Sequence, residues 1–463
     1  MDQIQEIPKK LKLTFCGGVG TVTGANFLLE EESTDTKILV DCGLEQGGEE
    51  AHAANRKPFI YDPSKIKVLM VTHAHVDHVG RIPKLVKDGF RGIIYSTPET
   101  MRLAPLMLED SVKLLAHEAE HYQEEPLYTE EDVAKALSLW KSIPYHHHFE
   151  IASGFDVYLK DAGHVLGSSM IELTYNGKKI VFTGDLGNSP SPLLKDTEPI
   201  TDADYLLMES VYGDRNHESR DERLNKFEDI IEDTIKKGGA LVIPSFSLEK
   251  TQDVLLELNN LIESGRVPSV PVYVDSPLAI KITQVYKTMP EDFNDQVREE
   301  IRRGDDVFNF PKIHFTETSE ESKAILNIPN PKIIIAGSGM SNGGRIQHHE
   351  VNYLSDPKST LLLIGYQAAG TLGRVIQDGS KTVTILGQEI KIKANIEYIS
   401  GYSSHKDSDH LFQFVEQTAD AVKKVFVVMG EAKSSLFLVQ RLRDYLGLEA
   451  FHPEEGESVL LDF

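Results

Sequence analysis

The stretch Thr72-His73-Ala74-His75-Val76-Asp77-His78 places four residues of metal-ligand type within six positions. It directly follows a β-rich run at residues 67–71, and residues 79–86 after it read as a helix. Residues two apart in an extended segment project to one side, so His73 and His75 can face one point, while Asp77 and His78 begin the turn and face a second. Nitrogen and oxygen donors of this kind suit zinc or a similar divalent ion. The stretch therefore predicts a metal site at the end of a strand.

Two further donors recur at the same kind of position. His164 follows a predicted strand at residues 155–160, and Asp185 follows another at residues 179–182. The alternative is a polar loop whose histidines are present by chance or for packing. Repetition of ligand-type residues after three separate strands disfavours that alternative.

These residues resemble, in order and context, the ligand motifs of the metallo-β-lactamase superfamily. The resemblance implies that His73, His75 and His164 hold one metal ion, that Asp77 and His78 belong to a second, and that Asp185 bridges them. It also implies metal-assisted hydrolysis with one or two zinc ions, manganese being an alternative. Lactam, thioester and phosphodiester chemistry all occur on this scaffold, so the fold alone does not decide the substrate.

A second resemblance narrows the substrate. Glu209 within residues 206–215, an α/β insert, and His405 within residues 400–407 resemble the β-CASP nucleases of that superfamily, as do residues 244–248, 275–279, 337–345 and 365–374. This group includes the nuclease subunit of the pre-mRNA cleavage and polyadenylation factor and bacterial ribonucleases. The resemblance pairs Glu209 with His405, so that a protonated His405 can donate to the departing oxygen of a phosphodiester. The candidate catalytic residues are thus Asp77, Glu209 and His405.

The pattern of expected elements divides the chain. Residues 12–16, 25–29 and 37–40 read as an antiparallel β start, whereas helices alternate with short apolar strands at 240–243, 272–275, 332–335 and 360–364. Such alternation implies a largely parallel sheet covered by helices. Together with this pattern, the resemblance implies an α/β class: an αβ/βα metallo-β-lactamase sandwich (1–211 and a return segment, 395–463) with an inserted α/β β-CASP domain (212–394).

Candidate phosphate or RNA contacts lie in the inserted domain. Loops rich in Gly can bring backbone N–H groups to a phosphate, and Arg can add bidentate contacts. The candidates are Ser247, Ser338, Arg345 and Arg374. For each Arg, a structural ion pair is the alternative. The glycine pairs at 18 and 20 and at 337 and 339 lack the third Gly of a dinucleotide fingerprint, so no nucleotide cofactor is expected.

One position departs from the family pattern. The family's last motif is a His before Gly-Glu at the end of a strand, a ligand of the second metal, but Met429 stands there in this chain. A thioether is a poor zinc ligand beside imidazole. We therefore expect one tightly held ion and a weaker second one.

Bulk properties bear on partners and compartment. The net charge of −24 would repel a polyanion at long range, although a metal pair and local Arg can reverse the field within one site because exposed charges are screened beyond about 10 Å. Two cysteines, Cys16 and Cys42, give no disulfide framework, residues 1–10 lack a signal-peptide core, and no apolar run is long enough to span a membrane. These features favour a cytoplasmic protein with no membrane partner.

The leading hypothesis is a ribonuclease that cleaves single-stranded RNA with metal-activated hydroxide. Endonucleolytic and 5′ exonucleolytic modes both occur in related proteins. One alternative is a weakly active or inactive RNA-binding subunit, motivated by Met429 and the negative charge; another is a metallo-hydrolase of a small-molecule ester or thioester. A homodimer is an open alternative to a monomer.

Overall fold

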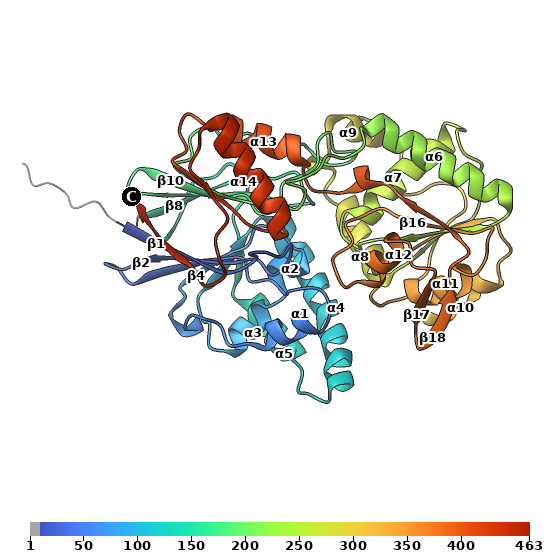
Figure 1. Ribbon diagram of the computed structural model, residues 1–463, viewed down its shortest axis with the longest axis horizontal. Coiled ribbons are helices and arrows are strands. Elements are labelled where there is room, and N and C mark those ends of the chain that lie inside the picture. Colours follow the sequence, from blue (N-terminus) through green and yellow to red (C-terminus); the bar gives the residue numbers. More distant parts are fainter. Residues whose placement is uncertain (1–9, 153) are drawn as a thin grey trace, which may run out of the picture. The chain divides into compact units, whose positions relative to one another are not determined.

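The computed structural model describes residues 10–152 and 154–463 (Figure 1). The chain forms two compact units: unit 1 comprises Met1–Ser189, Asp196–Asn216 and His405–Phe463, and unit 2 comprises Pro190–Lys195 and His217–Ser404. The domain boundaries expected at residues 211 and 394 stay a prediction. Residues 1–9, where no signal peptide is expected, lie outside the described residues.

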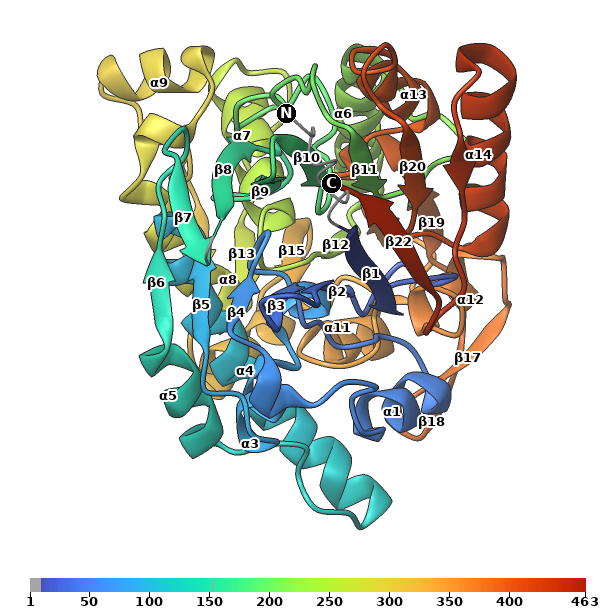
Figure 2. The same ribbon diagram turned by 90° about the vertical axis from the view of Figure 1, so that its left-hand side faces the viewer.

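Unit 1 is a sandwich of two seven-stranded sheets. The first sheet has the order β22-β1-β2-β3-β4-β5-β6, and the second has the order β21-β20-β11-β10-β9-β8-β7. The strands of the first sheet are β1 (Lys10–Gly17), β2 (Asn26–Glu31), β3 (Thr36–Val40), β4 (Val68–Met70), β5 (Ile93–Ser96), β6 (Trp140–Ser142) and β22 (Ser458–Asp462). Those of the second are β7 (Phe149–Ala152), β8 (Phe155–Asp161), β9 (Ser169–Tyr175), β10 (Lys178–Phe182), β11 (Tyr205–Met208), β20 (Lys424–Val427) and β21 (Ala450–Phe451). Figure 2 shows the last strand, β22, beside the first, β1, with which it pairs antiparallel.

Helices cover the outer faces of this sandwich. Figure 1 shows α3 and α5 on the side of the first sheet and α13 and α14 on the side of the second. The helices of unit 1 are α1 (Glu49–Arg56), η1 (Pro63–Lys65), α2 (Val76–Val79), α3 (Ile82–Lys87), α4 (Pro98–Tyr122), α5 (Glu130–Ser138), α13 (Ser408–Glu416) and α14 (Ala432–Leu446). One apolar cluster, with Phe15, Phe27 and Phe182, lies between the sheets, and two others fill the spaces between each sheet and its helices. The layering is the predicted αβ/βα sandwich.

The pairing directions in the second sheet explain where its polar residues gather. β10 pairs parallel with β11, β11 pairs parallel with β20, and β8 runs the same way because β9 is antiparallel to both β8 and β10. The carboxyl ends of β8, β10, β11 and β20 therefore lie at one edge. His164, Asp185, Glu209 and Met429 each follow one of these ends within three residues.

Unit 2 is built on a six-stranded sheet of order β14-β13-β15-β12-β16-β19, in which every neighbouring pair is parallel. Its strands are β12 (Ala240–Pro244), β13 (Val272–Asp275), β14 (Ile313–Phe315), β15 (Lys332–Ala336), β16 (Thr360–Leu363) and β19 (Asn395–Tyr398), with a separate hairpin of β17 (Thr382–Ile385) and β18 (Gln388–Lys391). The helical elements are α6 (Arg220–Lys237), α7 (Lys250–Glu263), α8 (Pro277–Lys287), η2 (Pro290–Asp292), α9 (Asp295–Arg302), α10 (Ser319–Ala324), η3 (Ile325–Asn327), α11 (Ile346–Tyr353), α12 (Leu372–Gln377) and η4 (Ser400–Tyr402). The predicted parallel α/β sheet is confirmed.

Local sequence accounts for the ends of the first helix of unit 2. Ser219 and Glu222 form a capping box at the start of α6, and Gly238 ends the helix in the left-handed conformation at φ 69°. Within residues 10–152 and 154–463, no helix combines the length and apolarity that crossing a bilayer requires. Cys16 and Cys42 are both free and buried.

Candidate active site

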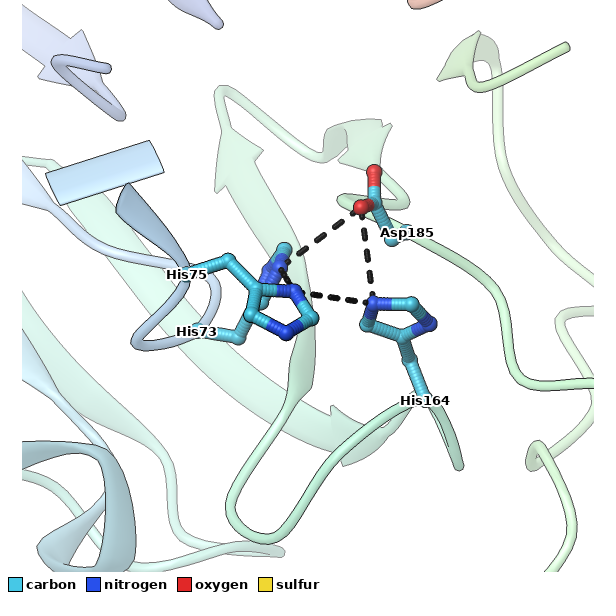
Figure 3. A group of neighbouring side chains, drawn as sticks. All are labelled: His73, His75, His164 and Asp185. Carbon is cyan, nitrogen blue, oxygen red and sulfur yellow. Dashed lines mark hydrogen bonds and ion pairs between the residues drawn. The ribbon is translucent and has the colours of Figure 1, made fainter. Parts of the chain in front are cut away.

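Four side chains from three loops converge on one point in unit 1 (Figure 3). Nε2 of His73 lies 3.1 Å from Nδ1 of His75, and Nε2 of His164 lies 3.2 Å from the same atom. Oδ2 of Asp185 completes the set at 3.6 Å from His73 and 3.5 Å from His164. Ligand atoms about 2.1 Å from a tetrahedral zinc ion would be about 3.4 Å apart. These four separations are close to those of a tetrahedral metal site, and all four ligand atoms lie within 4.8 Å of one another. We call this group the first site.

Electrostatics at the first site favours a neutral imidazole at His73. Burial holds the pKa of His73 well below its usual range, and the neighbouring histidines act in the same direction against the opposing charge of Asp185. A neutral ring presents a lone pair, which is the form that binds metal. A neutral His73 can therefore bind a cation at the first site.

A second set of donors shares Asp185. Nε2 of His78 lies 3.3 Å from Oδ1 of Asp185 and 3.9 Å from Oδ2 of Asp77. Nε2 of His78 and Oδ1 of Asp185 are both buried, and among the described residues neither atom makes a hydrogen bond of regular geometry apart from this ion pair. Buried polar atoms need partners because their desolvation is costly, and a cation held by both atoms would supply one. We call this group the second site.

Burial raises the pKa of Asp77 to about 6, with the positive charge of His78 opposing it. A bound cation at the second site would therefore compete with a proton on Asp77 at mildly acidic pH.

Asp41 contacts the ring nitrogen of His78 that points away from the second site. Its carboxylate accepts hydrogen bonds from the backbone N–H and the hydroxyl of Thr72 at 2.8 Å each, and it lies 2.8 Å from Nδ1 of His78. This contact turns Nε2 of His78 toward Asp185. Sequence reasoning did not select Asp41, although it follows the predicted strand at residues 37–40 directly, as the other donors follow theirs. Outer partners of this type fix the tautomer and direction of metal-binding histidines.

Met429 lies in the core between the sheets. Its side chain is 2% exposed and belongs to the apolar cluster with Phe15 and Phe27. A Cβ atom added to Gly18 would lie 2.5 Å from the sulfur of Met429. The absence of a side chain at Gly18 therefore leaves space for the thioether. Met429 and His78 line one small cavity, which places the thioether beside the second site. The second site therefore has three matched donors where the family pattern has four.

Glu209 and His405 lie next to the shared carboxylate. Nδ1 of His405 is 3.1 Å from Oε1 of Glu209 and 4.0 Å from Oδ2 of Asp185. The Glu209 carboxylate also accepts a 2.7 Å hydrogen bond from the backbone N–H of Leu186, which follows Asp185 directly. Burial lowers the pKa of His405, but the charges of Glu209 and Asp185 outweigh it and raise the pKa overall. The raised pKa favours the protonated form of His405, in which Nδ1 faces Glu209 and Nε2 is the other ring nitrogen.

The predicted phosphate contacts lie in unit 2. Ser247, Ser276 and Gly337 follow the adjacent parallel strands β12, β13 and β15, and the hydroxyls of Ser247 and Ser276 are 3.3 Å apart. Ser338 accepts a hydrogen bond from the backbone N–H of Asn342 at 3.1 Å. Carboxyl ends of parallel strands are the usual edge for ligand binding in such sheets.

The two predicted arginines have intramolecular partners. Arg345 donates to Oδ1 of Asp275 at 2.7 Å, and Arg374 donates to the carboxylate of Asp378 at 3.1 Å. Asp275 is fully buried, whereas the Arg374 and Asp378 pair lies on one turn of exposed helix. Arg345 is therefore fixed by an ion pair.

The first site, with its three histidines and shared carboxylate beside the His405 and Glu209 pair, has the donor set of a metal-dependent hydrolase. Family models match the chain in three stretches: Metallo-beta-lactamase superfamily at residues 20–262, Beta-Casp domain at 251–376, and Zn-dependent metallo-hydrolase RNA specificity domain at 389–453. The chain belongs to the metallo-beta-lactamase superfamily, in its Beta-Casp branch.

Relatives match over almost the whole chain. A protein of Thermus thermophilus named as a ribonuclease is 34% identical and covers 96% of this chain and 98% of its own length. A protein of Methanocaldococcus jannaschii named as RNase J-like is 31% identical over 92% of this chain and 95% of its own length. A transcription termination factor of Methanosarcina mazei is 30% identical over 97% of this chain and 72% of its own length.

Among solved structures, a protein of unknown function from Enterococcus faecalis aligns with a TM-score of 0.55 over 98% of this chain and 100% of that chain. At 13% identity, this likeness shows the fold alone.

Proposed function

We propose that this chain is a metal-dependent ribonuclease that hydrolyses phosphodiester bonds in single-stranded RNA. The observation that carries the proposal is the contact between Glu209 and His405 beside the metal-ligand set, because it adds a proton donor to a metal hydrolase. The RNA specificity domain model at residues 389–453 and the relatives named as ribonucleases support RNA as the substrate.

The chain's own residues have separate tasks in this proposal. His73, His75, His164 and Asp185 would hold a divalent ion, which would supply Lewis acidity for activating water and stabilising charge on the phosphoryl group. His405 gives the proton of Nε2 to the leaving ribose oxygen as its bond to phosphorus breaks. Glu209 holds the imidazolium in place before transfer and stabilises its charge.

For the metal content, we propose zinc at the first site and a weaker ion at the second, held by Asp77, His78 and Asp185. The three nitrogen donors of the first site match zinc chemistry. Metal analysis after dialysis tests this: one ion per chain is expected, and two firmly retained ions would contradict it. In Met429→His, the imidazole restores the family's fourth donor, so retention of a second ion should increase.

The proposed RNA contacts are Ser247, Ser338, Arg345 and Arg374 in unit 2. Ser247 lies at the carboxyl edge of the parallel sheet, where a phosphate can meet backbone N–H groups. The ion pair with Asp275 fixes the orientation of the Arg345 guanidinium. Arg345 would therefore contact a phosphate without first having to be ordered.

Cleavage assays on the metal-loaded protein test the function directly. With zinc or manganese supplied, 5′-labelled single-stranded RNA should be cut, and His73→Ala should abolish cutting. Short labelled products from the 5′ end would assign an exonucleolytic mode, and internal fragments would assign an endonucleolytic mode. Failure to cut any single-stranded RNA, with the ion bound, would overturn the proposal.

A weakly active RNA-binding subunit is the second candidate, and the position of Met429 in the core favours it. Tight RNA binding without cleavage by the wild type, together with cleavage by Met429→His, would select this candidate. We also infer a reducing, cytoplasmic environment from the two free cysteines. A homodimer remains a proposal that light scattering tests.

A further inference from the structure

The chain returns from unit 2 to unit 1 at His405. The position of His405 therefore depends on the contacts that this residue and its next neighbours make in unit 1. His405 belongs to no helix or extended strand; it forms an isolated bridge with Gly187. The backbone N–H of Lys406 donates to the carbonyl of Leu186 at 2.9 Å. The segment that carries His405 is therefore attached to the loop that carries Asp185.

The side chain of Lys406 adds a second attachment. It is 6% exposed, and its Nζ donates to the carbonyl of Gly187 at 2.8 Å and to the hydroxyl of Ser189 at 3.1 Å. Lysine is almost never this buried unless its ammonium group is held by specific partners. Its two acceptors both belong to the loop after β10.

Gly187 connects this loop to the one that carries His164. Its backbone N–H donates to the carbonyl of Ala162 at 2.8 Å, and a Cβ atom at this position would lie 1.9 Å from the carbonyl oxygen of Gly163. Only a glycine allows this close approach. Gly187 is therefore the point where three segments meet: the loop of His164, the loop of Asp185 and the segment of His405. Lys406 donates its hydrogen bond to the carbonyl of this residue.

We propose that Lys406 is a positioning residue that holds His405 in register with Asp185 and His164, so that its proton reaches the leaving oxygen. The inference rests on the proposed function of His405. In the step concerned, the oxygen of a water molecule bonds to phosphorus and its proton goes to solvent. The bond from phosphorus to the leaving oxygen breaks, and that oxygen takes the Nε2 proton of His405, which is left neutral. Lys406 neither gains nor loses a proton; it acts through its hydrogen bonds alone.

Substrates with different leaving groups separate this role from a merely structural one. A ribose oxygen needs a proton to depart, whereas nitrophenolate departs as a stable anion. Lys406→Met should therefore lower kcat on RNA about tenfold or more and leave KM unchanged. General acids contribute about 10²- to 10⁴-fold to a rate, and a misplaced acid loses a part of that factor. On bis(4-nitrophenyl) phosphate, its activity should fall less than about threefold.

The chain offers a matched control in unit 2. Lys332 is also buried, and its Nζ donates to the carbonyls of Ile325 and Ile328 at 2.7 and 2.6 Å. Burial lowers the pKa of Lys332 and of Lys406 alike to about 8. Lys332→Met thus measures the general effect of losing a buried lysine, and its ratio of RNA to nitrophenyl activity should equal that of the wild type.

His405→Ala provides the reference for the assay, and should show the same selective loss on RNA as Lys406→Met. In the double variant, Lys406→Met should cost nothing further on RNA because its effect passes through His405. The ratio of the two activities cancels the fraction of folded enzyme, and Lys406→Gln gives a second, polar replacement for the same measurement.

The outcomes distinguish the two levels of the proposal. If His405→Ala is selective but both Lys406 variants lose the two activities equally, or lose neither, Lys406 is not a positioning residue. If His405→Ala itself is not selective, the proposed acid role fails, and the inference about Lys406 fails with it.

Discussion

Two buried carboxylates, Asp275 in unit 2 and Asp185 in unit 1, differ in the groups that surround them. Asp275 accepts from Arg345, Thr316, Ser322 and His349 at 2.6 to 2.7 Å. Asp185 instead faces imidazole nitrogens, and its Oδ1 lies 3.3 Å from Nε2 of His78. The comparison teaches that a carboxylate filled by hydroxyl and guanidinium donors forms a structural cluster, whereas a carboxylate among imidazoles forms a candidate metal site.

The largest effect should come from removing the shared ligand. Asp185→Asn takes a negative oxygen from both metal sets, so we expect loss of the firmly held ion and a fall in RNA cleavage of roughly 10³-fold. Metal analysis and cleavage rates measure this. Retention of one ion with near-normal cleavage would show that Asp185 is no more a ligand than Asp275 is.

The same substitution in unit 2 should affect stability instead. Asp275→Asn removes the charge that accepts from Arg345 and leaves buried donors poorly paired, which costs about 1–3 kcal/mol of unfolding free energy, while metal content stays at the wild-type level. Denaturant unfolding followed by metal analysis tests both parts. A loss of metal without a loss of stability would contradict the structural assignment.

Acid should weaken the same cluster in the wild type. Burial alone would raise the pKa of Asp275, but hydrogen bonds from His349, Ser322, Thr316 and Arg345 outweigh it and hold the pKa well below its usual range. The stabilisation is therefore present above the unfolded-state pKa and is lost as pH falls toward the folded-state pKa. Asp275→Asn should lack this contribution to acid sensitivity.

A smaller effect is expected behind the second site. Asp41→Asn weakens the contact that orients His78, and outer-partner changes of this kind cost about 10- to 100-fold in metal affinity. Titration with a metal chelator should show weaker binding of the second ion and little change at the first. Equal weakening at both sites would mean that Asp41 supports the loop as a whole.

The smallest change should be a shift in pH dependence. His405 acts when protonated, and its raised pKa keeps it protonated until pH rises through that value, so cleavage should then decline. Glu209→Gln removes a charge that raises this pKa, so the basic limb of the RNA profile should move down by about one pH unit. An unmoved basic limb would assign that titration to another group.

The convergence of the candidate ligands could largely be predicted because each of them lies shortly after the end of a strand in sequence. Two ligands two residues apart in an extended segment already share a side, and the parallel directions of β8, β10 and β11 bring His164, Asp185 and Glu209 to one edge. The alternation of helices and apolar strands likewise predicted the parallel sheet of unit 2.

Long-range contacts could not be predicted in the same way. Arg345 and Asp275 are 70 residues apart, and nothing near either one in sequence identifies its partner. The strand β19 joins the sheet of unit 2 through β16, although residues after about 394 read as part of the return segment. Asp41 was also missed, because its task depends on His78, 37 residues later.

The insertion of unit 2 also orders events during synthesis. All six candidate ligands lie before residue 186, whereas His405 and the strands β20 and β22 of the same sandwich come more than 200 residues later. At ribosomal rates of about 5–20 residues per second, the acid follows the last ligand by roughly 10–40 s. A nascent chain therefore exposes a metal-binding segment before it has the residue that completes cleavage. A chain truncated after residue 404 should bind no more than metal, and RNA cleavage by it would refute this order of maturation.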